Sequence, residues 1–283
     1  MLSFFFIEQY TIGSKVILGI FFIALASMFF YYAYRMIEMA YVMRNKRPLF
    51  VHFYLKQKKL ATTHLSILQE QFSFYGKLPM KHKGFFEHRV ASFIKDKTFI
   101  GRNGLKIDDK VQVLISATAV MLTFGFRDFY IGLIDKIFVY PDAFYSNINK
   151  EHHKGEFNPK LKALVLSWDD FKHGYDIDND NLNLGIHEFA HAIHLNSIKE
   201  RDVSATVFKD AFKELTQLLS NDEPLRQRLV ASRYFRDYAY TNQFEFLAVL
   251  IEYFFESPME FKNQFPKIYE KVKQMLNFEY AGY

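Results

Sequence analysis

Three residues in the middle of the chain have the types and spacing needed to bind a metal ion and activate water. His187 and His191 are four positions apart, Glu188 follows the first, and residues 184–194 show the apolar spacing of a helix. Both imidazoles therefore project from one helical face and can reach one ion. A carboxylate beside them can accept a proton from a metal-bound water. The pattern predicts His187 and His191 as metal ligands and Glu188 as general base.

The alternative is a chance arrangement of buried or surface histidines without a metal. Apolar residues between and around the two histidines can pack this helix into a core, and a polar loop precedes it, which favours the metal site. His194 lies on nearly the same side of the helix. We expect it to lie outside the ligand set, either as a supporting residue or exposed.

A catalytic zinc site needs a third protein ligand, with a fourth position open to water. The chain has no cysteine, so the ligand must be His, Asp or Glu. A predicted helix at 242–255 offers Glu245 and Glu252 about two turns apart on one face. Glu245 fits a capping role equally well, because Asn242 stands three residues before it. Glu252 lies deeper in the apolar helix, where we expect it to bind the second N–H of a ligating histidine.

Hydrophobic periodicity predicts an α+β fold dominated by helices, with a small sheet. The strand at 163–168 is expected to pair with an extended substrate. A loop is predicted from Asp176 to Asn183, just before the metal-binding helix. Helices are predicted at 63–74, 85–94, 110–124, 184–196, 204–219, 242–255 and 259–276, and strands at 137–140 and 163–168.

The N-terminal segment predicts a single membrane-spanning helix. Residues 16–34 carry no charged side chain, which is long enough to cross the hydrocarbon core. Lys and Arg are frequent after it, so the following domain is expected on the cytoplasmic side of the cell (inner) membrane. A signal peptide cleaved near 24–26 and a buried core helix are the alternatives. The predicted division is 1–36 for the membrane segment, 37–60 for a basic linker and 61–283 for a catalytic domain.

Composition limits the classes of partner. The net charge of +5 and pI near 9.0 are spread along 283 residues, which is unlike a basic nucleic-acid groove, so no nucleic-acid partner is expected. The absence of cysteine excludes disulfides and mildly favours a reducing compartment. With half of the residues hydrophobic and few Gly and Pro, the chain is expected to be globular.

Several motifs resemble the Mlc titration factor A (MtfA) family of zinc-dependent peptidases. The resemblance covers roughly residues 75–260 and leaves out the membrane segment. The motifs that carry it are Val165-Leu166-Ser167-Trp168-Asp169-Asp170, residues 181–183, His187-Glu188-Phe189-Ala190-His191, and further stretches at 99–101, 139–142 and 242–255. It implies a zincin-like metallopeptidase domain that binds Zn²⁺.

The resemblance also implies roles for two further residues. That family and the related peptidase domain of anthrax lethal factor have a Tyr and a Glu separated like Tyr238 and Glu245. By analogy Glu245, rather than Glu252, is the third zinc ligand, and Tyr238 donates its hydroxyl to the oxyanion. An ordinary core tyrosine is the alternative for Tyr238.

The expected function is that of a membrane-anchored zinc metallopeptidase that hydrolyses a peptide or protein substrate. The alternative is a membrane-bound regulatory module that docks a protein partner. The family's sugar-responsive repressor is not carried over as that partner, because this chain has an anchor and has Ile193-His194 where the family commonly has Leu-Asp.

Overall fold

The computed structural model describes residues 11–146, 150–176 and 180–283. Residues 1–10 of the predicted membrane segment and 177–179 of the predicted loop lie outside the described residues. The chain forms two compact units, one ending at Leu49 and one running from Phe50 to Tyr283. Each unit is described by itself.

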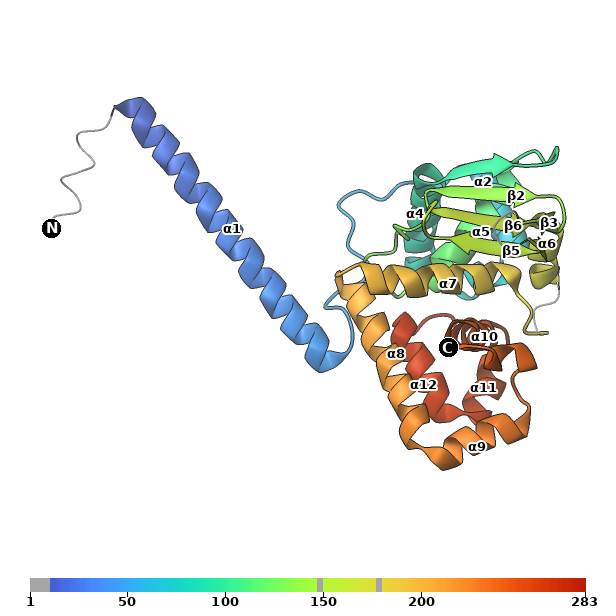
Figure 1. Cartoon of the computed structure of the whole chain (residues 1–283). Coiled ribbons are helices and arrows are strands. Elements are labelled where there is room, and N and C mark those ends of the chain that lie inside the picture. The colour runs from blue at the N-terminus through green and yellow to red at the C-terminus, as the bar shows by residue number, and fades with distance from the viewer. Residues whose placement is uncertain (1–10, 147–149, 177–179) are drawn as a thin grey trace. The chain divides into compact units, whose positions relative to one another are not determined.

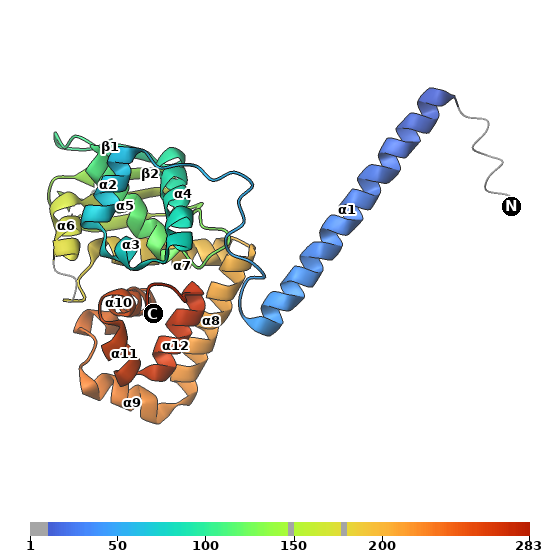
Figure 2. The same cartoon turned by 180° about the vertical axis from the view of Figure 1, so that it is seen from behind.

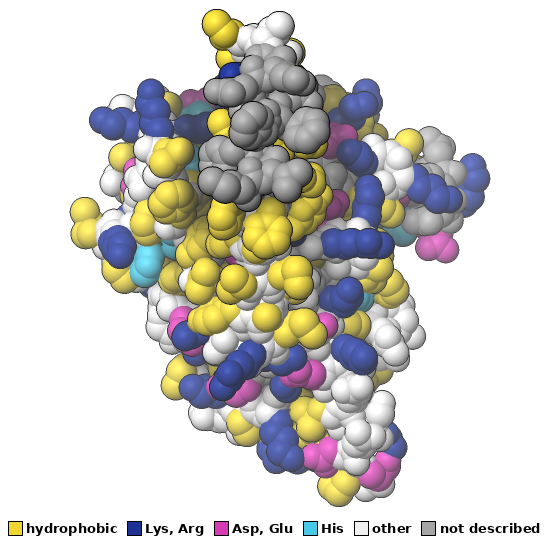
Figure 3. All heavy atoms as spheres, turned by 90° about the vertical axis from the view of Figure 1, so that its left-hand side faces the viewer, with side chains coloured by type: hydrophobic (Ala, Val, Ile, Leu, Met, Phe, Trp, Pro, Cys, Tyr) yellow, Lys and Arg dark blue, Asp and Glu magenta, His cyan; other side chains and the backbone are white. Residues whose placement is uncertain are grey.

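The first unit contains one long helix, α1 (Ile12–Asn45). Its start is capped by Thr11, whose hydroxyl accepts a hydrogen bond from the Ser14 amide at 3.3 Å. The helix is long and apolar enough to cross a membrane, with a mean hydropathy of 2.2 in its most apolar window. No residue of that window is buried, so the structure does not use it as a core helix. Apolar side chains cover its surface (Figure 3).

The second unit contains a four-stranded mixed sheet. Its order is β1-β2-β6-β5; β1 and β2 run parallel, as do β2 and β6, and β5 pairs antiparallel with β6. A separate two-stranded ribbon joins β3 and β4. The strands are β1 (Thr98–Gly101), β2 (Lys136–Tyr140), β3 (Phe144–Tyr145), β4 (His152–His153), β5 (Gly155–Asn158) and β6 (Ala163–Ser167).

The predicted pairing of the 163–168 strand with substrate is wrong, because β6 lies inside the sheet. Val165 pairs with Phe138 on one side and with Glu156 on the other, which leaves no free edge. A nearly continuous apolar run is typical of such a central strand. The free edge on this side of the sheet belongs to β5, and Trp168 already starts the next helix.

Helices dominate the second unit, which confirms the predicted α+β class. One face of the sheet is covered by α2, α4 and α5, and α7 runs beside the β5 edge (Figures 1 and 2). The helices are α2 (Thr62–Gln71), α3 (Ser73–Lys77), α4 (Met80–Asp96), α5 (Asp109–Leu122), α6 (Trp168–Asp176), α7 (Leu184–Lys199), α8 (Val203–Asn221), α9 (Glu223–Ser232), the 3₁₀ helix η2 (Asp237–Tyr240), α10 (Gln243–Glu256), α11 (Pro258–Gln264) and α12 (Pro266–Leu276).

The helix predicted at 259–276 is two helices. Pro266 has no amide hydrogen and a fixed φ, so it cannot continue α11 but suits the first position of α12. The helix predicted at 63–74 is also divided, at Phe72. The sequence reading missed α6 and α9.

A fully buried arginine ties the start of the second unit to its core. Arg89 on α4 has no exposed surface. Its Nε donates to the Tyr54 hydroxyl at 2.6 Å, and its terminal nitrogens donate to the carbonyls of Thr123 at 2.8 Å and Phe126 at 2.7 Å. Its guanidinium also lies 4.5 Å from the centre of the Phe129 ring. These bonds offset the cost of burying the charge and hold residues just after α5 against α4.

Arg89→Met should lower the free energy of unfolding of the second unit by about 3 kcal/mol or more, because buried carbonyls lose their donors. Denaturation followed by the fluorescence of Trp168, the single tryptophan, measures this unit. Arg201 is exposed and provides the matched control, with an expected change within about 0.5 kcal/mol for Arg201→Met. Equal losses in both variants would contradict the role given to Arg89.

Candidate metal centre

The start of α7 is fixed by an asparagine cap and by close packing on α6. Asn183 Oδ1 accepts a hydrogen bond from the Ile186 amide at 3.0 Å, and its Nδ2 donates to the Gly174 carbonyl at 2.7 Å. A Cβ at Gly185 would lie 2.5 Å from the Phe171 ring, so only glycine allows this approach. The Asn183 cap and the contact of Gly185 with Phe171 together fix the helical turn that carries His187.

The structure brings His187, His191 and Glu245 together. The Nε2 atoms of the two histidines are 3.1 Å apart, and Glu245 Oε2 lies 2.9 Å from His187 Nε2 and 3.4 Å from His191 Nε2. These residues come from α7 and α10, more than fifty positions apart in the sequence. Among the described residues they form the one group whose donor atoms converge closely enough to hold a metal ion.

The triangle fits the ligand set of a tetrahedral divalent metal. Nitrogen and oxygen ligands about 2.0 to 2.1 Å from zinc in a tetrahedron lie roughly 3.3 Å from one another. The three observed separations lie close to that value. Glu245 Oε2 is buried, yet no described group makes a well-aligned hydrogen bond to it. Its nearest polar neighbours face a common point with it, which is how metal ligands are arranged.

Glu252 holds His187 from behind. Its Oε1 lies 2.7 Å from His187 Nδ1, and its Oε2 accepts a hydrogen bond from the Asn183 amide at 3.0 Å. Arg236 binds both oxygens, at 2.7 and 3.0 Å. The Glu252 side chain is 1% exposed, so this charge is removed from water and satisfied by four donors. A bond through Nδ1 leaves Nε2 directed at the ligand triangle.

The surrounding charges favour a cation in the triangle. Burial lowers the pKa of His187, but the adjacent carboxylates of Glu245 and Glu252 outweigh it and raise that pKa to about 9. Burial raises the pKa of Glu245, but the His187 and His191 rings outweigh it and hold that pKa well below its usual range. Two carboxylates thus stabilise positive charge at this point.

Glu188 lies against the edge strand of the sheet. Burial raises its pKa, while the His187 and His191 rings act in the opposite direction. A Cβ on Gly155 of β5 would lie 2.6 Å from its Oε1, so this strand can reach the carboxylate only because residue 155 is glycine. A buried carboxylate with a raised pKa is suited to accept a proton.

Tyr238 lies beside the triangle on η2. Its ring centre is 6.0 Å from that of His187, and half of the side chain is exposed, which excludes an ordinary core tyrosine. Burial of the remainder and the Glu245 carboxylate raise its pKa to about 12. The hydroxyl therefore stays protonated at neutral pH and can donate a hydrogen bond.

Two features of the site were not found from the sequence. Arg236 was not predicted. A buried Glu252 implies that a positive partner lies nearby, but the sequence does not show which residue that is. Gly155 was also missed, since nothing local links β5 to Glu188. His194 is buried among aromatic rings, not exposed, and burial lowers its pKa to about 4.

A cleft of about 430 Å³ opens at this site. It lies between the β4–β5 segment and the start of α7, and its walls include His153, Leu182 and Tyr238 as well as His187 and Glu188. This volume is typical of small-molecule and side-chain pockets. The cleft gives a ligand access to the candidate base and to His187 of the ligand triangle.

Comparison with known proteins identifies relatives across most of the chain. An uncharacterized protein of Synechocystis is 25% identical over 242 residues, which cover 78% of this chain and 85% of that protein. Mlc titration factor A of Yersinia enterocolitica is 31% identical over 116 residues, 38% of this chain and 41% of that protein. Mlc titration factor A of Yersinia pestis is 23% identical over 196 residues, 64% of this chain and 72% of that protein.

A family model described as glucose-regulated metallo-peptidase M90 matches residues 42–277. That range includes the whole ligand triangle, Glu188, Tyr238 and Glu252, and it begins inside α1. The resemblance to Mlc titration factor A is confirmed by these relatives, and a divalent metal is implied by the family. The chain therefore belongs to the M90 family of glucose-regulated metallo-peptidases.

Proposed function

We propose that this chain is a zinc-dependent peptidase in which His187, His191 and Glu245 hold the ion. The observation that carries the proposal is the triangle of donor atoms separated by 2.9 to 3.4 Å. Two imidazoles and one carboxylate are a donor set suited to catalytic zinc. When bound, zinc supplies a Lewis acid and lowers the pKa of a bound water.

The chain's own residues then have distinct tasks. Glu188 accepts the proton of the attacking water and passes it to the leaving amine. Tyr238 donates its hydroxyl to the oxyanion that develops on the scissile carbonyl. Glu252 keeps the His187 ring oriented, and Arg236 keeps Glu252 in place.

An extended peptide is the substrate that the site fits, bound along the free edge of β5. The Lys154 carbonyl accepts a hydrogen bond from the Ser167 amide at 2.7 Å. Because main-chain groups alternate along an antiparallel pair, those of Gly155 and Phe157 face away from β6. A peptide paired there would lie beside Glu188, which touches Gly155.

The helix α1 is proposed to anchor the chain in the cell membrane. Its apolar length suffices to cross the bilayer, and Arg35, Arg44, Lys46 and Arg47 follow or end the apolar stretch. Positive residues on that side place the peptidase unit in the cytoplasm. The proposed division of the chain stays at 1–36, 37–60 and 61–283.

Glu188→Gln should retain zinc and lower kcat by roughly a hundredfold or more, because the amide cannot accept the water's proton. Metal analysis and cleavage of a peptide library, with and without chelator, measure both quantities. Unchanged cleavage would remove Glu188 as the base. A wild-type chain that binds zinc but cleaves no peptide would instead favour the alternative function, a membrane-bound regulatory module that docks a protein partner.

Glu245→Ala and Glu252→Gln should differ in zinc affinity. The first removes a ligand and should abolish stoichiometric zinc binding, while the second removes a support and should weaken zinc affinity by about 10- to 100-fold. Competition with a chromogenic chelator measures the affinities. Exposed Glu260→Gln on α11 is the control and should leave affinity unchanged. Stoichiometric zinc in Glu245→Ala would contradict the assigned ligand.

The membrane fraction of cells should retain the full chain after washes with high salt or alkaline carbonate, because α1 is held by apolar burial and not by charge. Immunoblots of the washed pellet and the supernatant measure retention. Release by either wash would remove the spanning helix from the proposal.

A further inference from the structure

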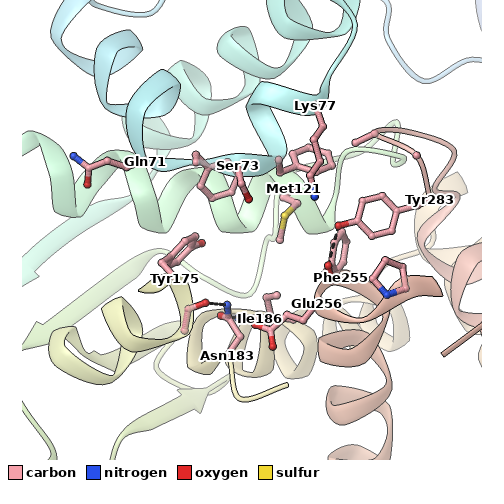
Figure 4. Close-up of a pocket in the computed structure, with 16 residues that line it drawn as sticks. Gln71, Ser73, Lys77, Met121, Tyr175, Asn183, Ile186, Phe255, Glu256 and Tyr283 are labelled. Atoms are coloured by element: carbon pink, nitrogen blue, oxygen red, sulfur yellow. Dashed lines mark hydrogen bonds between the residues drawn. The ribbon is translucent and has the colours of Figure 1, made fainter. Parts of the chain in front are cut away.

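A second pocket of about 340 Å³ lies next to the metal centre, and Asn183 lines both (Figure 4). Its walls come from α2 and α3, from α5, from the start of α7, from the end of α10 and from the C-terminal residues. Neither the ligand triangle nor Glu188 contributes to it. The pocket therefore has no part in the chemistry described above.

The wall of this pocket contains a buried carboxylate without a partner. Both oxygens of Glu256 are buried, and neither makes a hydrogen bond to any described residue. Burial raises its pKa to about 8, although the Asn183 side chain and the Asn181 amide are near enough to act in the opposite direction. Glu252, one turn earlier on α10, is satisfied by four donors. Buried polar groups are nearly always paired, and no described residue supplies a hydrogen-bond partner to Glu256.

A positive charge faces the pocket from the other wall. The Lys77 side chain points into the pocket from α3, while Glu256 enters from α10 (Figure 4). The two do not form an ion pair, and the described residues offer Lys77 no other acidic partner within 4 Å. The pocket thus presents the Lys77 ammonium group at one point and the Glu256 carboxyl group at another, and the raised pKa of Glu256 leaves it largely protonated until a cation binds beside it.

Apolar side chains form part of the surface between these two groups. Met121, Ile186 and the aromatic rings of Phe72, Phe255 and Tyr283 contribute to it. Aromatic rings near a carboxylate favour an organic ammonium group, and the volume suits a small molecule. A metal cation is disfavoured, because one carboxylate supplies too few ligands.

We propose that this pocket binds a small α-amino acid with an apolar side chain. Its ammonium group donates to Glu256, its carboxylate lies toward Lys77, and its side chain packs on the aromatic rings. A simple amine would gain nothing from the exposed Lys77, and a simple carboxylate would leave Glu256 buried and unpaired. Only a zwitterion satisfies both charges.

Binding is tested by calorimetry on the full chain in detergent micelles, with L-phenylalanine and L-leucine as probes. The amino acids should bind saturably, while 2-phenylethylamine and 3-phenylpropionate, which each lack one charged group, should bind about tenfold more weakly than L-phenylalanine. Binding should persist after a chelator has removed metal, which separates this pocket from product binding at the metal centre. Loss of binding on chelation, or no saturable binding of either amino acid, overturns the proposal.

Variants locate the binding. Glu256→Gln should weaken L-phenylalanine binding at least tenfold, and Lys77→Met several-fold, whereas Glu260→Gln on α11 should bind as the wild type does. Thermal melting verifies that each variant is folded; Lys77 is exposed, so its variant provides the test even if Glu256→Gln fails to fold. Equal affinities in the wild type and in either pocket variant overturn the proposal. Metal binding and peptide cleavage are measured separately, so failure here leaves the proposed peptidase untouched.

Discussion

The geometry of the metal centre depends on one buried carboxylate that joins two helices. Glu252 on α10 accepts the amide of Asn183, which begins α7, and binds the Nδ1 side of His187 four residues later. The same helix α10 carries Glu245 two turns before Glu252. The distance between His187 and Glu245 is therefore influenced by Glu252, which lies on the helix of Glu245 and binds both His187 and the start of α7. A catalytic site loses function when its groups shift by about 1 Å. The hydrogen bonds of Glu252 therefore matter because they fix the position of the His187 ring in the ligand triangle.

Helix α10 carries two buried carboxylates, Glu252 and Glu256, that differ in their hydrogen-bond partners. The cost of burying the Glu252 charge is offset by the bidentate hydrogen bonds from Arg236 and by two further N–H donors. Glu256, one turn on, has no such partner, and its raised pKa follows from that difference. Asn183 lies between these two carboxylates: its amide donates a hydrogen bond to Glu252, and the residue also lines the second pocket. A molecule bound at Glu256 would thus contact the residue that caps the metal-binding helix.

The sequence determined the local parts of this site better than the distant ones. The spacing of His187 and His191 sufficed to place both on one face, because helical periodicity is local. The sequence left Glu245 open between a ligand and a capping carboxylate until family resemblance was considered. In the structure its carboxylate faces the histidines, and the cap is Asn242, whose Oδ1 accepts a hydrogen bond from the Glu245 amide. The interior position of β6 could not be read from its own residues, because strand order depends on partners elsewhere in the chain. The break at Pro266, by contrast, is encoded locally, because proline cannot continue a helix.

The order of the sheet holds the proposed base, Glu188, and the proposed substrate edge, β5, in a fixed relation to one another. β5 is the outermost strand on this side, and α7 runs beside it, so one element contacts the helix of the metal centre and also exposes unpaired main-chain groups. Gly155 makes this possible, because any side chain there would displace the Glu188 carboxylate. The antiparallel pairing of β5 with the buried β6 holds Gly155 in place from its other side. A peptide added to that edge would therefore meet the proton acceptor at a distance set by the sheet and not by a mobile loop.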